Sequence, residues 1–325
     1  ILRLYLPLLP GVIRGVYCLR QKEKSGVVLK PKGKLYRGWW IVIANLAILS
    51  VVFGVGFYSF GIFFKPLTMD FGWSRVAVSG AMSVFTLLWG LSAPLGGRLS
   101  DRFGPKIVML LSAIPFGGSF LLLSRIQTLW QLYIFYSLLA FTYGGLSLVP
   151  ISKMVNRWFQ LEKGLAMGIT FSGVSLGGLI FAPIVGYVVN TLGWRDAYTL
   201  LGIGSWIILL PTIAFILKDE PEILHPTKVE IQETKAASRS AKVNNPPASP
   251  QWTIHRMLRS PVFWGISLAF FLVNLGQIGV LIHEVPFLTD MGISPVVAAS
   301  ILGFTSGLGI LGKLIAGYTA DRMSR

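Results

Sequence analysis

Eight long apolar runs dominate this chain, and each is long enough to cross a lipid bilayer, which takes roughly 20 residues. They lie near 39–64, 75–95, 107–124, 129–151, 164–192, 197–217, 262–289 and 296–318. Charged residues make up only 13% of the chain, about half of what a water-soluble domain carries. Glycine and proline recur inside the runs, as transmembrane helices tolerate. The pattern predicts an all-α, multi-pass integral membrane protein.

The net charge of +16 is explained by where the basic residues lie along the chain. If the N-terminal tail is cytosolic and the spans alternate, 24 of the 29 Lys and Arg residues fall on the cytosolic side and four on the other. The remaining one, Lys313, lies inside a span. This asymmetry is the positive-inside bias. It predicts a protein of the plasma or inner membrane with a cytosolic N-terminus, and it gives no reason to invoke nucleic acid as a partner.

An internal repeat relates two parts of the chain at a constant offset of 220 residues: "PLTMDFGWS" (66–74) corresponds to "PFLTDMGIS" (286–294), and "GGRLSDR" (96–102) to "AGYTADR" (316–322). Six spans separate equivalent points, so both copies have the same orientation, as in two parallel six-helix halves.

The repeat defines the expected domains of the chain. We expect a cytosolic tail at 1–38, a six-helix half at 39–217, a polar cytosolic linker at 218–260, and the first two helices of a second half at 261–325. Because the chain starts at Ile rather than Met, part of the tail is interpreted as not native. By the measure of the first half, four further helices are expected, so the chain is interpreted as C-terminally incomplete.

The loop between the second and third spans carries a motif that resembles the signature of the major facilitator superfamily. The motif is Gly97-x-x-x-Asp101-Arg102-x-Gly104-x-Lys106, with a partial copy at Gly317-x-x-x-Asp321-Arg322. Three stretches, 58–75, 156–178 and 283–294, are similar to the monocarboxylate transporter and oxalate/formate antiporter branch of that family. The resemblance implies a major facilitator fold, with a six-helix N-terminal half plus the first two helices of the C-terminal half. It also implies transport of small organic anions.

The signature loop and its copy are predicted to act as a conformational latch. Asp101 lies at a helix end, where its carboxylate can pair with Arg102 or face the positive end of a neighbouring helix. Gly97 and Gly104 allow close approach and a sharp turn. Such contacts form only when the cytosolic faces of the two halves are close. The alternative is that Arg102, Lys106 and the other basic residues of the loop only fix the topology.

Lys313 is the one Lys or Arg inside a predicted span, and ionisable groups within the membrane are functional candidates. Gly309 and Gly317 flank it on the same helix face. The resemblance places it where this branch carries a basic residue that binds the substrate carboxylate. The alternative is snorkelling to the interface, about 8 Å away. Against this, the repeat partner of Lys313 is Ala93, so the fold does not require a cation at this depth.

Tyr58 and the pair His283–Glu284 are weaker candidates. Tyr58 lies where the animal monocarboxylate transporters carry a lysine. It can hydrogen-bond a substrate but cannot carry that proton, which argues against lactate/proton symport of the animal type. His283 and Glu284 have Phe63 and Phe64 as repeat partners, and they could take part in proton coupling because His titrates near neutral pH. Solvation at a helix end is the simpler interpretation.

Two small-xxx-small pairs, Gly164/Gly168 and Gly173/Gly177, lie on the fifth span. Such spacing lets helix backbones approach closely, so we expect it to serve packing. No metal-ligand cluster, Walker loop or Ser–His–Asp arrangement is recognisable, so we predict no cofactor, no catalytic residue and no enzyme.

The resulting hypothesis is a secondary active transporter that works by alternating access. Its substrate is expected to be a small organic anion, a mono- or dicarboxylate, carried with or without a co-transported ion or proton. The alternative is a facilitator-fold sensor that does not transport, or a truncated, non-functional product.

Overall fold

The computed structural model describes residues 37–159, 162–219 and 258–323, so the expected tail and most of the expected linker lie outside the described residues. Every regular element within the described residues is a helix. Eight helical segments there are long and apolar enough to cross a membrane. The prediction of an all-α protein with eight spans is therefore confirmed.

Three of the first six spans are built from more than one helical segment. The first comprises α3 (Arg37–Phe53), the π-helix η1 (Gly54–Tyr58) and α4 (Phe60–Phe71). The second and third are α5 (Arg75–Phe103) and α6 (Pro105–Leu123), and the fourth joins α7 (Leu129–Leu146) to α8 (Leu148–Trp158). The fifth is α9 (Lys163–Leu192), and the sixth is α10 (Trp194–Pro211) with the π-helix η2 (Thr212–Ile216).

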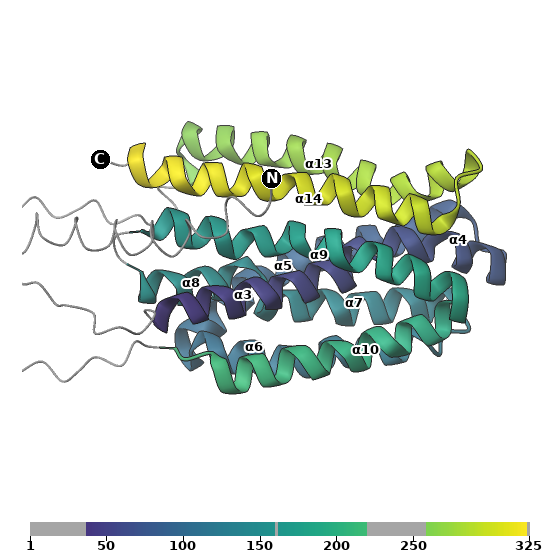
Figure 1. Ribbon diagram of the computed structural model, residues 1–325, viewed down its shortest axis with the longest axis horizontal. Helices are drawn as coiled ribbons and strands as arrows, with labels where there is room; N and C mark the ends of the chain where they lie inside the picture. The colour runs from purple at the N-terminus through teal and green to yellow at the C-terminus, as the bar shows by residue number, and fades with distance from the viewer. Residues whose placement is uncertain (1–36, 160–161, 220–257, 324–325) are drawn as a thin grey trace, which may run out of the picture. The chain divides into compact units, whose positions relative to one another are not determined.

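The last two described spans are α13 (Pro261–Asp290) and α14 (Pro295–Met323). Helix α14 lies alongside α9 (Figure 1), and α13 contacts both α14 and α4.

The sequence repeat is also a repeat of local structure. Helices α5 and α14 have bounds that differ by the same 220 residues at both ends. Each begins after a serine, Ser74 or Ser294, whose hydroxyl accepts a hydrogen bond from the backbone N–H three residues later, at 3.2 and 3.4 Å. Gly72 and Gly292 make the preceding turns with φ of 64° and 88°, a conformation that glycine adopts without strain.

The π-helix in the first span is held by a tyrosine from the fourth span. The hydroxyl of Tyr143, which is fully buried, donates a hydrogen bond of 2.7 Å to the carbonyl of Val52, just before the π-helix. Gly56, inside the π-helix, leaves room for this hydroxyl. Single π turns inside α-helices are frequent at functional sites. Here the π turn ends at Tyr58, one of the predicted substrate-binding residues.

The glycines of α9 serve packing, as predicted, but on two opposite faces. Gly173 and Gly177 lie against α3, where the Ser50 hydroxyl donates to the Gly173 carbonyl at 2.9 Å. On the other face, a Cβ added to Gly168 would lie 3.2 Å from the Cα of Gly317 on α14. Helix α9 therefore connects the first half of the chain to α14 through backbone contacts on both sides.

Candidate functional site

Lys313 directs its ammonium group at α9 rather than at the end of its own helix. Its Nζ donates a hydrogen bond of 2.6 Å to the hydroxyl of Ser175 on α9, and its side chain is half-buried. The same Nζ lies 4.0 Å from the position of a Cβ on Gly309, one turn back along α14. Snorkelling toward Tyr318 would point the side chain in the other direction. The ammonium group therefore lies between two spans.

Tyr58, the last residue of the π-helix in the first span, lies against the same stretch of α14. Its side chain is 6% exposed and lies beside the side chain of Ser306. A Cβ on Gly178 of α9 would lie 3.2 Å from its ring, so the ring packs against α9 as well. Ser306 and Gly309 are three residues apart, roughly 4.5 Å along the helix axis. The structure thus brings both predicted substrate-binding residues, Tyr58 and Lys313, to the middle of α14.

The charge on Lys313 has no carboxylate within salt-bridge distance among the residues that the structure describes. Its hydrogen-bond partner, Ser175, is neutral. A cation without a counter-charge in a low-dielectric interior costs several kcal/mol. Ammonium and hydroxyl groups are donors that suit a carboxylate. Lys313, Ser175 and Tyr58 together form the candidate anion site.

Glu284 does not fit a solvated helix end. One of its oxygens, Oε1, accepts a hydrogen bond of 3.3 Å from the hydroxyl of Thr305 on α14. The other, Oε2, is buried and has no hydrogen-bond partner among the described residues. The neighbouring His283 lies edge-on against Phe64 of α4, with the ring centres 6.0 Å apart. The two residues therefore face different helices.

The second copy of the signature loop contacts the first half at the start of α9. Both oxygens of Asp321 accept hydrogen bonds of 2.8 Å, from the backbone N–H groups of Gly164 and Leu165. These groups lie at the start of α9, where the helix dipole favours a negative charge. Gly317 packs against the same turn of α9, and the Arg322 guanidinium lies 4.6 Å from the ring centre of Tyr318.

The first copy behaves differently, and the predicted partners of Asp101 were wrong. Its carboxylate pairs with Lys153 of α8 at 2.6 Å. The Lys153 ammonium also donates to the carbonyl of Gly97 at 2.7 Å. Arg102 instead lies over the ring of Phe103, 5.2 Å from its centre. Consecutive residues on a helix do not face each other, which explains why Asp101 and Arg102 do not pair. The contacts of Gly97, Asp101 and Arg102 stay within the first half.

Gly104 and Lys106 lie at the start of α6, next to the carboxylate of Asp219, a contact that the sequence did not predict. Gly104 has a φ of 86°. The backbone N–H of Lys106 donates to Asp219 at 2.8 Å, and its ammonium donates to the carbonyl of Ala214 at 2.8 Å. Asp219 follows the sixth span and lies in the segment that the sequence predicts to be a linker, 218–260. The only sequence feature that pointed to this contact was an acidic residue directly after an apolar run.

A second group of charges connects the repeat copies at the opposite end of the spans. Asp290, the last residue of α13, pairs with Lys65 of α4 at 3.0 Å and with Arg75 of α5 at 2.8 Å. We call these three residues the Asp290 clasp. Asp70, the repeat partner of Asp290, pairs with Arg195 at 3.3 Å. Sequence reasoning missed the clasp, although Asp70 and Asp290 occupy equivalent positions in the repeated loops at 66–74 and 286–294.

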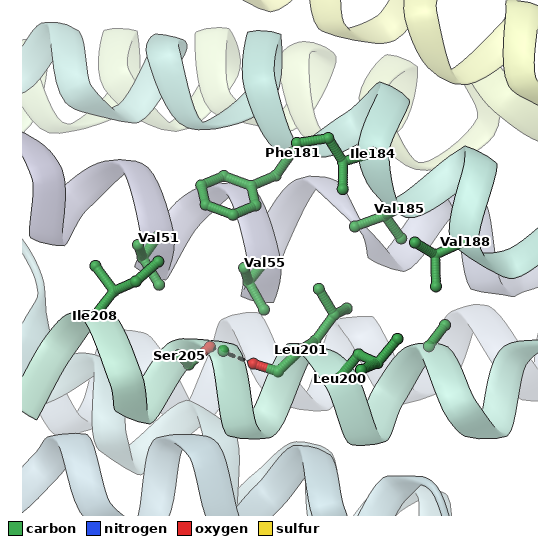
Figure 2. A pocket seen from close by; sticks show the side chains of 12 residues that line it. Val51, Val55, Phe181, Ile184, Val185, Val188, Leu200, Leu201, Ser205 and Ile208 are labelled. Atoms are coloured by element: carbon green, nitrogen blue, oxygen red, sulfur yellow. Dashed lines mark hydrogen bonds between the residues drawn. The ribbon is translucent and has the colours of Figure 1, made fainter.

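A cavity of about 190 Å³ lies elsewhere, between the first span, α9 and α10 (Figure 2). Apolar residues such as Val55, Phe181 and Leu201 line it, and no charged residue does. The one hydroxyl in its wall, on Ser205, donates to the carbonyl of Leu201 at 2.6 Å. An anion would find no counter-charge there. Within the described residues, no group of three His, Cys, Asp or Glu side chains could hold a metal ion either.

Comparison with known proteins identifies the family of this chain. Residues 46–325 match the Major Facilitator Superfamily. Monocarboxylate transporter 13 from Bos taurus is 27% identical over 284 residues, 87% of this chain and 62% of the relative. The oxalate:formate antiporter from Oxalobacter formigenes is 26% identical over 90% of this chain and 66% of its own.

A solved structure gives the same fold. It is that of a bacterial homologue of the human lysosomal transporter Spinster, in an inward-facing and unoccupied conformation. It has 17% identity and a TM-score of 0.65, and the match covers 89% of this chain and 64% of the other. The chain thus spans less than two thirds of the length of these relatives. The resemblance to the monocarboxylate and oxalate/formate branch is confirmed, and the chain belongs to the major facilitator superfamily.

Proposed function

We propose that this protein is a secondary active transporter, not an enzyme, that carries a small organic anion with one or two carboxylates. The observation that carries the proposal is Lys313. Its ammonium lies between α9 and α14, half-buried, and bonds a neutral serine. Relatives named for monocarboxylates and for oxalate and formate support this substrate class.

In the proposed complex, a substrate carboxylate accepts hydrogen bonds from Lys313 and from the hydroxyls of Ser175 and Tyr58. The site is shared by α14 and by two spans of the first half, so the bound anion contacts both halves of the repeat. Opening one end requires the Asp290 clasp to separate, and opening the other requires Asp321 to leave α9. We propose that the clasp end faces outward and the Asp321 end faces the cytosol, as alternating access requires.

The test is uptake and binding of radiolabelled formate, pyruvate, lactate and oxalate by the full-length protein in proteoliposomes. Hydrogen bonds to charged groups contribute about 1.5–3 kcal/mol. Lys313→Gln should therefore weaken binding roughly 10- to 100-fold. Lys313→Arg should retain part of the affinity, because it keeps the charge but changes the geometry. Arg125→Gln, which removes one exposed positive charge outside the spans, is the matched control.

Two results would contradict the proposal. If Lys313→Gln binds the anions as tightly as the wild type, Lys313 is not the anion-binding group. If folded wild-type protein neither binds nor transports any of the four probes, a facilitator-fold protein that does not transport becomes the better account.

A further inference from the structure

We propose that the apolar cavity between the first span, α9 and α10 binds an acyl chain of a membrane phospholipid. The cavity lies apart from the candidate anion site, because none of its lining residues belongs to that site. The inference therefore does not depend on the proposed function. Three helices build the wall, as Figure 2 shows. The first span supplies Val51 and Val55, and the other lining residues lie on α9 and α10.

The cavity is a groove with a buried floor and an exposed rim. Val51, Val55 and Val185 are at most 3% exposed. On the rim, Ile184 of α9 is 49% exposed and Leu200 of α10 is 50% exposed. These values hold with α14 packed against α9, so the described helices of the second half do not cover the rim. In a membrane span, an exposed rim of aliphatic side chains faces lipid hydrocarbon.

The wall of the groove suits hydrocarbon and not water. Its single hydroxyl, on Ser205, already donates to the carbonyl of Leu201 at 2.6 Å. A buried water needs two to four polar partners, and an apolar cavity stays dry and takes apolar guests instead. Wall atoms that face open space lose their van der Waals contacts. An acyl chain restores those contacts and requires no hydrogen bond.

Gly204 shows that the space between α10 and α9 is real. It lies on the wall of the groove, and a Cβ added to it would meet no atom within 4 Å. A Cβ added to Gly202, two residues earlier, would lie 2.8 Å from the carbonyl oxygen of Gly117 on α6. Helix α10 therefore packs closely against α6 on one side and leaves room for a guest on the other.

The dimensions of the groove fit a straight chain. Along α10 the lining residues run from Ala197 to Ile208, about 16 Å along the helix axis. A cavity of about 150 Å³ holds benzene, so the volume of about 190 Å³ holds a segment of about seven or eight carbons. The rest of the chain extends past the rim into the bilayer. The groove thus seats part of one acyl chain between two helices.

The polar end of the lipid is placed by the turn between α9 and α10. Val188 and Ala197 line the end of the groove next to this turn. Trp194 and Arg195 begin α10 there. Tryptophan is enriched at the level of lipid headgroups, and an arginine can contact lipid phosphate. The lipid therefore belongs to the leaflet on the side of the Asp290 clasp, where Arg195 pairs with Asp70.

A chain in the groove packs against the π turn of the first span, because Val55 belongs to that turn. The surrounding lipid is as apolar as the groove, so the affinity comes from close packing and not from transfer out of water. The bound chain acts as part of the packing between the first span, α9 and α10. It should leave more slowly than the lipids that only surround the protein.

The first experiment photolabels the full-length protein in phosphatidylcholine bilayers. The probe is a phosphatidylcholine with a diazirine in the middle of one acyl chain, and mass spectrometry maps the labelled residues. Binding in the groove predicts the strongest labelling of α10 at Leu201 and Gly204. Ile203 and Ile207 are the internal control, because they are 45% and 67% exposed on the same helix and do not line the groove.

The second experiment fills the groove. Gly204→Leu should reduce the labelling of Leu201 about tenfold or more, because the new side chain and the acyl chain cannot share the space. Gly204→Ala is the matched control, since it also removes a helical glycine but leaves most of the groove open. Thermal unfolding in the same bilayers checks that both variants fold. Cholesterol added to the bilayer should not reduce the wild-type labelling.

The outcomes decide the inference even if Gly204→Leu fails to fold. Wild-type labelling that follows exposure, with Ile203 and Ile207 strongest, shows only the lipids that surround every membrane protein and overturns the inference. Absence of label from Leu201 and Gly204 also overturns it, since another segment of the full-length protein then covers the groove. Labelling that persists in a folded Gly204→Leu variant contradicts the site, and loss of labelling with cholesterol contradicts the choice of an acyl chain.

Discussion

Replacing Asp321 with Asn should loosen the contact between α14 and α9. In the wild type, two backbone N–H groups, those of Gly164 and Leu165, each donate to a different oxygen of this carboxylate at 2.8 Å. Asparagine keeps nearly the same shape and one acceptor oxygen. It loses the charge, and its amide nitrogen is a donor that would face a second donor. At least one of the two hydrogen bonds is therefore lost.

The size of the effect follows from these contacts. A hydrogen bond to a charged group contributes about 1.5–3 kcal/mol, and a charge at a helix N-terminus adds about 0.3–1 kcal/mol. Asp321 is half-buried, so partial solvent screening places the total near the lower end. We expect about 2 kcal/mol, which changes the equilibrium between closed and open states at this end roughly 30-fold.

Pulsed electron spin resonance distances can measure this shift. We would place spin labels at Asn156 on α8 and Thr319 on α14, both exposed, in full-length protein with Cys18 replaced. Asp321→Asn should increase the population with long distances. The matched control is Asp101→Asn, because Asp101 is 71% exposed and its pair stays within the first half. Such pairs contribute about 0.2–1 kcal/mol. An unchanged distribution in Asp321→Asn, or a larger change in Asp101→Asn, would refute the reasoning.

Three further predictions concern the rest of the bundle. Asp290→Asn should open the clasp end, and salt should weaken the wild-type clasp because its ion pairs are partly exposed. Faster maleimide labelling of a cysteine placed at Phe64 would show both effects, and equal labelling rates would contradict them. Gly317→Val should force α14 away from α9 and lower stability by about 1–3 kcal/mol, seen as a reduced Tm, with an unchanged Tm as the contrary result. Tyr143→Phe should leave the Val52 carbonyl unpaired at a cost of about 1–3 kcal/mol, also measured by thermal unfolding; a neutral effect would mean that another group satisfies this carbonyl.

The spans and the repeat were predictable because they depend on local properties. The length of each apolar run and the side of the membrane that carries the basic residues can both be read along the chain. The repeat predicts that α5 and α14 begin and end at equivalent positions, 220 residues apart. The π-helix was not predictable, because it is stabilised by Tyr143 from another span. Gly54–Tyr58 contains nothing that distinguishes it from an ordinary helical turn.

The candidate site was predictable only in part. Lys313 stands out because a cation inside an apolar run is rare. Its partner Ser175 does not stand out, because serine is common in transmembrane helices. Asp101 was assigned the wrong partner because Lys153 is 52 residues away in the sequence. Which helix faces meet is a tertiary property, and neither spacing nor composition reports it.

The π turn in the first span changes the rotational phase of everything after it. In an uninterrupted α-helix, Leu46, Ser50, Gly61 and Phe64 would lie within roughly 60° of each other, on one face. In this structure the first two contact α9, whereas Gly61 and Phe64 contact α13. An extra residue in one turn rotates the following helix by about 100°, which turns one stripe of the sequence toward two different neighbours. Deleting a single residue between Gly54 and Tyr58 would restore the α-helical phase, and the first span could then face only one of them.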